Sequence, residues 1–246
     1  MEVRQVVNAL QIVEYFAVRG LPATLAEVSK HFDWPRSSTF NLLGTLVSRG
    51  YLYEPRAREG YYPSPRWLEL AAKIDRASPI PSELHELLRA LWKRTGETAV
   101  LASISGMYAV FIATVESQEA VRYSAEVGKV VPVHATATGR ALLSQLSEAD
   151  RAAILRRAVF EKYTSTTLLS VQAVENEIAL SLQKGYFEGV GEFTRDLGGI
   201  AMPLDVPQRH FAVLVAGPVT RVDSRKDEFV RIIAEEIARY MPSKSS

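Results

Sequence analysis

Cysteine is missing from this chain of 246 residues, and so are long hydrophobic runs. The first absence excludes disulfides, thiolate metal ligands and cysteine nucleophiles, and it fits a reducing compartment. The second excludes a spanning helix, because apolar stretches such as residues 211–217 are far shorter than the roughly 18 residues needed. Met1 is followed by no apolar signal segment. We therefore expect a cytoplasmic protein that does not enter a membrane.

The chain also lacks an excess of charge of either sign. Its 29 Lys and Arg nearly balance its 28 Asp and Glu, which leaves a formal net charge of +1. A globally basic coat for nucleic acid is thus excluded, and any phosphate-binding charge must be local. Residues 34–66 hold five arginines against two acids. Positive charge is therefore concentrated in this one region.

Familiar catalytic motifs are absent as well. The sequence contains no G-x-S-x-G, no G-x-x-x-x-G-K-[ST] and no H-E-x-x-H. Four histidines occur, at positions 31, 85, 134 and 210, too far apart to suggest a local metal site. We expect neither an enzyme nor a cofactor or metal, although a catalytic group assembled from distant residues is not excluded by spacing.

Apolar residues at helical spacing predict a first helix over residues 3–17 and a second over 25–32. In the first helix the stripe expected to be buried consists of Val3, Val6, Val7, Leu10, Val13 and Phe16. Thr24 and Glu27 stand three residues apart, which is the pattern of a capping box opening the second helix.

A third helix is predicted to run to about Arg49, with Asp33 placed to cap it and Pro35 in its first turn. Its apolar side is expected to hold Phe40, Leu43, Leu46 and Val47. Its other side carries short polar side chains, namely Ser37, Ser38, Asn41, Thr45 and Ser48. Gly50 ends the helix, and residues 51–54 and 60–63 are predicted as two strands joined by "PRARE". Together these elements form a winged helix-turn-helix.

The remaining sequence predicts a linker helix and a second domain. A helix starting at Pro65 breaks at Pro79 and Pro81, so we place the boundary near Ser78, with domains over 1–77 and 78–246. Strands are expected at 97–104, 108–117, 121–127, 186–193, 198–206 and 210–219, with helices across 82–94, 137–184 and 224–241. This order indicates an α+β fold.

The third helix suggests contact with DNA. Serine and asparagine on an exposed helix face reach base edges in the major groove without a long side chain holding the helix away. Hairpin arginines would reach the backbone or minor groove of the same duplex. The residues expected to contact DNA are Thr24, Arg36, Ser37, Ser38, Thr39, Asn41, Arg56 and Arg58. The alternative is a metabolite-sensing adaptor whose winged module binds protein and whose polar face is merely solvated.

Several segments, in order, resemble the isocitrate lyase regulator (IclR) family of bacterial transcription factors. "LAEVSKHFDWPRSSTFNLLGTLVSRGYL" is similar to that family's winged helix-turn-helix. "VVPVHATATGRALLSQL" resembles the opening of its effector-binding domain, and "KGYFEGVGEFTRDLGGIAMPL" with "FAVLVAGP" resembles its last strands. The resemblance implies a winged helix-turn-helix, a linker helix and a GAF/PAS-like effector-binding domain, in which an antiparallel sheet is flanked by helices.

The resemblance also implies an effector site. Its residues are Ala137, Thr138, Gly189, Asp196, Leu197, Gly199, Leu214 and Ala216, to which we add Arg195 as a nearby cation. Gly189, Leu214 and Ala216 stand where relatives often carry polar groups, so we expect a more apolar pocket. Asn41 stands where an arginine is common, so we expect a phosphate affinity or a base preference that differs from that of relatives.

Structural roles are the alternative for these residues. The glycines from 189 to 199 could serve tight turns, and Thr136 and Thr138 could cap a helix. His134 is expected to be a satisfied structural histidine, and Arg195 with Asp196 could be an exposed pair.

The function expected from these patterns is sequence-specific, effector-controlled DNA binding. The effector would be a small organic molecule, with organic or aromatic acids favoured, and the operator would be double-stranded. Because one recognition helix covers few base pairs, we expect a homodimer or tetramer joined through the first helix and the linker helix.

Overall fold

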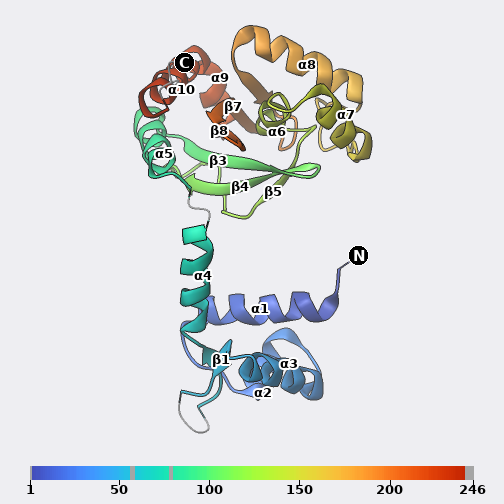
Figure 1. Cartoon of the computed structure of the whole chain (residues 1–246), viewed down its shortest axis with the longest axis vertical. Helices are drawn as coiled ribbons and strands as arrows, with labels where there is room; N and C mark the ends of the chain where they lie inside the picture. The colour runs from blue at the N-terminus through green and yellow to red at the C-terminus, as the bar shows by residue number, and fades with distance from the viewer. Residues whose placement is uncertain (1, 56–58, 78–79, 242–246) are drawn as a thin grey trace. The chain divides into compact units, whose positions relative to one another are not determined.

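The computed structural model describes residues 2–55, 59–77 and 80–241. The chain divides into two compact units, residues 1–79 and 80–246, and each is described by itself (Figure 1). The described elements of unit 1 are α1 (Arg4–Arg19), α2 (Leu25–Phe32), α3 (Arg36–Ser48), β1 (Leu52–Tyr53), β2 (Tyr62–Pro63) and α4 (Arg66–Ala77).

The core of unit 1 lies where α1, α2 and α3 meet the β1–β2 wing. Its fully buried side chains include Ile12, Phe16, Val28, Leu43 and Leu52. β1 and β2 pair antiparallel, and a further bridge joins Ala23 to Tyr61. Gly60 allows that approach, because a Cβ there would lie 2.3 Å from the Ala23 backbone and its φ is +97°. The predicted helix-turn-helix with a wing is confirmed.

The buried face of α1 differs from the prediction. Val3, Val6 and Leu10 are each more than half exposed, and the buried residues are Ile12 and Phe16. The first half of α1 is separated from α3 by a groove, so only its second half packs into the core. Helical spacing located the helix but not which part of it a neighbour covers.

The turn between α2 and α3 also differs from the prediction. Asp33 adopts a left-handed conformation with φ 54° at the end of α2, where its N–H donates to Ser29 O. Pro35 is the N-cap residue of α3, and no side chain caps that helix. The capping box at α2 is confirmed, since Glu27 N donates to Thr24 Oγ1 and Thr24 N donates to Glu27 Oε2.

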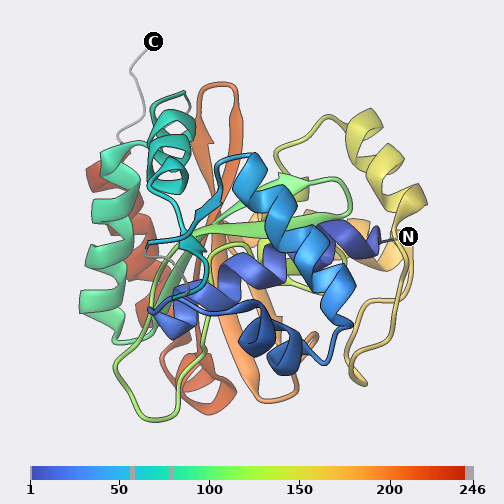
Figure 2. The same ribbon diagram turned by 90° about the horizontal axis from the view of Figure 1, so that it is seen from below.

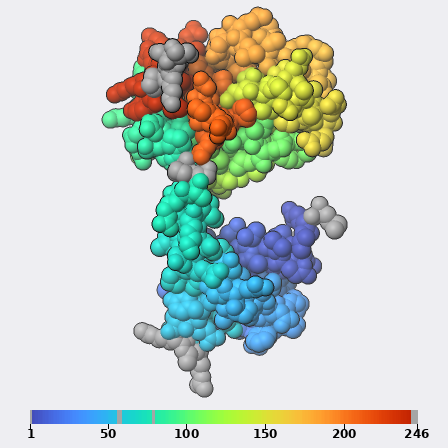
Figure 3. Space-filling view, viewed as in Figure 1, coloured from blue at the N-terminus to red at the C-terminus, as the bar shows by residue number. Residues whose placement is uncertain are grey.

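α4 has no buried residue within the described structure, and much of its surface (turquoise) is open in Figure 3. Leu68 and Ile74 are 77% and 72% exposed. An amphipathic helix normally buries its apolar side, so these exposed side chains are available for contact.

Unit 2 is an antiparallel sheet covered by helices on both faces. Its described elements are α5 (Ser82–Thr95), β3 (Thr98–Ser105), β4 (Tyr108–Val115), β5 (Val130–Pro132), α6 (Ala137–Leu143), α7 (Glu148–Arg157), α8 (Val171–Lys184), β6 (Phe187–Val190), β7 (Leu197–Val206), β8 (Arg209–Pro218), α9 (Val219–Ser224) and α10 (Lys226–Tyr240). Within these residues the strand order is β5-β4-β3-β8-β7-β6. Figure 2 shows the long β7–β8 hairpin in orange.

Side chains of the central strands alternate between two cores. Along β8, Leu214 and Ala216 lie in the core under α6, whereas Val213 and Val215 lie in the core under α5 and α10. This alternation follows from the two-residue period of a strand that is covered on both faces. The predicted α+β fold is confirmed, and the cavity described below lies on the α6 side.

The strand predicted at residues 121–127 is wrong, because this segment forms no strand. Its polar backbone atoms bond to side chains instead of to a neighbouring strand. Thr98 Oγ1 donates to Tyr123 O at 2.6 Å, and Ala125 N donates to Glu116 Oε1 at 3.0 Å. A loop that satisfies its backbone in this way needs no strand partner.

Candidate functional site

The exposed face of α3 carries several polar side chains that make no hydrogen bond to the rest of the described protein. Arg36, Ser37, Ser38 and Asn41 are all exposed. Within the described residues, the side chains of Ser37, Ser38 and Asn41 make no hydrogen bond to protein. They are therefore available to base edges or phosphates.

Other residues predicted to contact DNA are placed differently. Thr24 is partly buried and its hydroxyl serves the capping box. Thr45 and Ser48, which were predicted on the polar side of α3 but not as DNA contacts, are exposed, and their hydroxyls donate to the backbone oxygens of Asn41 and Thr45. Arg56 and Arg58 lie outside the described residues.

Thr39 corrects the predicted DNA-binding set. Its side chain is fully buried and its hydroxyl donates to Pro35 O at 3.1 Å, so it cannot reach a base in this conformation. Phe40, predicted to be inside, is 57% exposed. The core side of α3 thus holds Thr39 beside Leu43, and Phe40 lies outside it.

One groove of unit 1 runs between α1 and α3. Ser38, Asn41 and Thr45 line it from α3, while Gln5 and Asn8 line it from α1. Part of the polar face of α3 therefore lies across this groove from the first half of α1.

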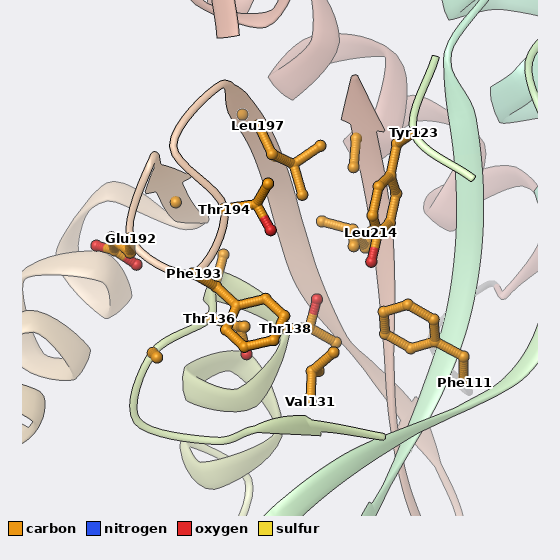
Figure 4. A pocket seen from close by; sticks show the side chains of 16 residues that line it. Phe111, Tyr123, Val131, Thr136, Thr138, Glu192, Phe193, Thr194, Leu197 and Leu214 are labelled. Atoms are coloured by element: carbon orange, nitrogen blue, oxygen red, sulfur yellow. The ribbon is translucent and has the colours of Figure 1, made fainter. Parts of the chain in front are cut away.

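Unit 2 contains a cavity on the α6 side of the sheet (Figure 4). Water-sized molecules can be centred in about 50 Å³ of it, and protein atoms leave about 440 Å³ unfilled when the part open to solvent is included. The first of these volumes is below the roughly 300–1,000 Å³ that is typical of sites for small organic molecules. Seven of the residues expected to bind an effector line it: Ala137, Thr138, Gly189, Leu197, Gly199, Leu214 and Ala216. Arg195 and Asp196 are exposed and are not among the lining residues.

Further side chains that were not predicted from the sequence as effector contacts also line the cavity. They include the aromatic residues Phe111, Tyr123 and Phe193, together with Val131 and Thr194. Phe111 follows the alternation of β4, but a bulge at Ile112 shifts the register, so Ala113 enters the opposite core. Tyr123 belongs to the loop over residues 121–127, which was predicted to be a strand. Alternation could have found Phe111, whereas no local signal placed Tyr123 or Phe193 here.

The beginning of α6 forms one wall of the cavity. Thr136 Oγ1 accepts from Gly139 N at 3.1 Å, so Thr136 is the N-cap residue. Thr138 is only 2% exposed and makes no side-chain hydrogen bond to the described protein. Capping therefore accounts for Thr136 but not for Thr138.

A buried ion pair stands beside the cavity. Arg140 is fully buried and donates from Nη1 to Glu192 Oε2 and from Nη2 to Glu188 O, each at 2.7 Å. Burial raises the pKa of Glu192 above its usual value, although Arg140 opposes this rise. Arg140 Nε is buried without a protein partner. Glu192 belongs to the lining, whereas Arg140 does not.

Threonines hold the loop that carries Glu192 and Phe193. Thr167 Oγ1 donates to Glu192 O at 2.7 Å and accepts from Tyr163 N and Thr164 N. Thr166 Oγ1 donates to Gly191 O at 3.0 Å. Phe193 meets Tyr163 edge to face, with ring centroids 4.8 Å apart. The loop that forms this cavity wall is thus held in place by residues 163–167, which do not line the cavity.

The described residues hold no candidate metal cluster and no candidate membrane helix. No group of three or more His, Cys, Asp or Glu in this part of the chain could hold a metal ion. None of its helices combines the length and the apolar character needed to cross a bilayer. His134 is buried and lies 3.3 Å from Glu161 O through Nε2, which is the structural role expected for it.

Comparison with known proteins gives matches to both units. The C-terminal domain of the bacterial transcriptional regulator IclR matches residues 74–240, and the IclR helix-turn-helix domain matches residues 5–56. The acetate operon repressor of Salmonella typhimurium strain LT2 is 28% identical over 232 residues, covering 92% of this chain and 85% of that protein.

Two solved structures show the same fold. The Thermotoga maritima IclR structure has a TM-score of 0.77 at 20% identity and covers 97% of this chain and 98% of its own. An IclR homolog from Microbacterium hydrocarbonoxydans, complexed with 4-hydroxybenzoate, has a TM-score of 0.71 at 21% identity and covers 98% of this chain and all of its own. Because the C-terminal match alone spans more than half of the sequence, the chain belongs to the IclR family, whose members are DNA-binding transcriptional regulators and not enzymes.

Proposed function

We propose that α3 reads operator DNA and that a small organic molecule in the cavity of unit 2 controls this binding. The observation that carries the first part is the set of exposed, uncommitted side chains at Ser37, Ser38 and Asn41. Short donors and acceptors on a helix that follows a turn suit the major groove. Arg36 at the start of α3 would contact a phosphate.

The active species would be a homodimer or a tetramer. Operators usually present two half-sites about one helical turn apart, which requires two recognition helices. Exposed apolar side chains on α1 (Val3, Val6, Leu10) and α4 (Leu68, Ile74) support contact with a second copy. This arrangement fits the expectation that α1 and the linker helix form the dimer surfaces.

The effector would occupy the cavity beside α6. Its aromatic and apolar lining suits one aromatic ring, and the structure of the Microbacterium homolog is a complex with a ring compound, 4-hydroxybenzoate. Control requires that the ligand favour one arrangement of the paired DNA-binding units, with coupling on the order of 1–3 kcal/mol.

Selection of duplexes from a random library by the full-length chain tests the DNA-binding part. We expect enrichment of a symmetric or tandem site, and a changed sequence preference for Asn41→Ala. Asn176→Ala, an exposed asparagine on α8, is the matched control and should select the same site as the wild type. Failure to enrich any sequence, with binding to a protein partner instead, would favour the adaptor.

A cavity variant tests effector control. Leu214→Asp places a charge in the cavity lining and should abolish the response to ligands while operator affinity stays unchanged. Ala216→Val, which narrows the cavity without adding charge, is the second variant if Leu214→Asp unfolds. An unchanged ligand response in the folded variants would place the effector elsewhere.

A further inference from the structure

The cavity of unit 2 offers no cationic side chain to a bound molecule. Glu192 is the one charged side chain among its lining residues in the described structure. Its carboxylate is paired with Arg140, through Nη1 at 2.7 Å and Nη2 at 3.2 Å. Arg140 is fully buried, and Arg195 does not line the cavity. An anionic ligand would therefore find a carboxylate and no unpaired cation.

Binding an anion here would be unfavourable, because a carboxylate that leaves water without a cationic partner loses its hydration. Burial already raises the pKa of Glu192, which indicates that this environment disfavours negative charge. A second carboxylate at the same site would meet the same environment.

The start of α6 is the competing site for an anion, through the N–H groups of Ala137 and Thr138. A Cβ at Gly189 would lie 3.4 Å from Ala137 N and 3.6 Å from Glu192 Oε2. Both atoms therefore lie near Gly189, and the carboxylate of Glu192 is paired there with Arg140.

Three hydroxyls instead offer neutral hydrogen bonding. Tyr123, Thr138 and Thr194 point into the cavity from three different segments (Figure 4). None of the three hydroxyls bonds to another group in the described residues. Burial raises the pKa of Tyr123 to about 12, so its phenol stays protonated and can donate near neutral pH. Such groups match hydroxyl or carbonyl oxygens.

Aromatic side chains complete the environment. Phe111 meets Tyr123 edge to face, with ring centroids 6.4 Å apart, and Phe193 lies on another wall. Leu197 and Leu214 add apolar surface (Figure 4). Flat apolar surfaces with a few directed hydroxyls suit an aromatic ring.

We propose that the effector is an uncharged aromatic compound bearing hydroxyl or carbonyl groups, and not a carboxylate. This inference rests on the proposed function, since it concerns the ligand of the same cavity. Tyr123 and Thr138 would supply hydrogen bonds, and Phe111 and Phe193 would contact the ring.

Paired probes test the class of ligand. Calorimetry at about pH 6.5 on the full-length protein would compare 4-hydroxyacetophenone with 4-hydroxybenzoate, which share a phenol ring and differ in charge. We expect the neutral probe to bind at least about tenfold more tightly, because only the anion would lose its hydration in a cavity whose lining offers no cationic side chain. Equal or tighter binding of 4-hydroxybenzoate, or no binding of the neutral probe, would overturn the inference.

Single-atom variants locate the binding. Tyr123→Phe and Thr138→Val should each weaken the neutral probe several-fold without lowering thermal stability, since neither hydroxyl bonds to the protein. Tyr163→Phe is the matched control, because that hydroxyl donates to Glu161 outside the cavity lining. Equal effects from Tyr123→Phe and Tyr163→Phe would contradict the site.

Failure of the inference and of the proposed function can be separated. A protein that selects a DNA site but responds only to carboxylates would contradict the ligand class and keep the regulator. A protein that binds the neutral probe but selects no DNA would keep the ligand class and contradict the regulator.

Discussion

Arg140 is the largest fully buried side chain in the described residues, and Glu192 is the carboxylate that balances it. Arg140→Ala would leave that carboxylate buried without its partner. We expect the free energy of unfolding to fall by about 3–5 kcal/mol, measured by urea denaturation. The raised pKa of Glu192 would limit this loss at low pH, because a protonated carboxyl needs no counter-charge.

Arg89→Ala is the matched control for this prediction. Arg89 pairs with Glu86 on α5, but its side chain is 61% exposed, so its loss should cost less than about 1 kcal/mol. Equal losses from the two variants would contradict the role given to the buried pair.

A second prediction at the residue scale concerns pH. Burial lowers the pKa of His134, although the bond to Glu161 O opposes the shift. The unfolded chain therefore takes up a proton near pH 6.5 before the folded chain does, and stability should fall as pH drops below that value. The slope contributed by this group cannot exceed about 1.4 kcal/mol per pH unit.

Urea unfolding between about pH 5 and 7.5 checks the prediction for His134. His134→Asn removes the titrating group, so its stability should depend less on pH than that of the wild type. Identical slopes for both proteins would show that other groups dominate this range.

At the scale of elements, local patterns predicted the helices, the capping box and the strand β8. These features depend on neighbours in sequence, and Thr24 was placed correctly in the capping box. The limit of such patterns is visible on α3, where Phe40 was predicted to be buried but is exposed, and Thr39 is buried instead. Periodicity defines two sides of a helix, but the packing of α1 and α2 decides which residues at the border are covered.

About half of the residues that line the cavity could be predicted from the sequence. Residues on α6, β7 and β8 follow from regular structure and family resemblance. Tyr123, Phe193 and Glu192 come from loops whose position depends on distant partners, such as Thr98 and Thr167. No local pattern encodes those contacts. Arg195 was predicted at the cavity because it is close in sequence to the lining residues, but it does not line the cavity, since closeness in sequence does not fix the direction of a side chain.

Thr167 supports a prediction about the loop that carries Phe193. Its hydroxyl joins two backbone N–H groups to Glu192 O, so Thr167→Val leaves all three without this partner. We expect a loss of about 1–3 kcal/mol and faster amide exchange at residues 190–196. Thr220→Val, at an exposed threonine on α9, should change neither quantity. Unchanged exchange in Thr167→Val would remove the role of this hydroxyl.

At the scale of the whole molecule, regulation requires that ligand binding in one unit alter DNA binding by the other. A ligand with equal affinity for both arrangements of the dimer would change nothing. Neither unit can supply this coupling alone, which is why association through α1 and α4 belongs to the proposal.

Arg56 and Arg58 provide a prediction that depends on charge. Replacing both with alanine should weaken binding to any duplex, because hairpin arginines are expected to neutralise phosphates. The slope of log affinity against log salt should become shallower by about 0.9 for each phosphate that the variant leaves unneutralised. Anisotropy titrations at several salt concentrations measure this slope. Unchanged affinity and slope would favour a winged module that binds protein.

The sharpest test of DNA reading by α3 is the affinity of Asn41→Ala for the selected duplex and for a scrambled duplex, measured by fluorescence anisotropy at one salt concentration. We predict that affinity for the selected duplex falls by about 5- to 150-fold, corresponding to roughly 1–3 kcal/mol for a base contact. Affinity for the scrambled duplex should stay unchanged. Wild-type affinity for both duplexes in the variant would contradict the claim that α3 reads DNA.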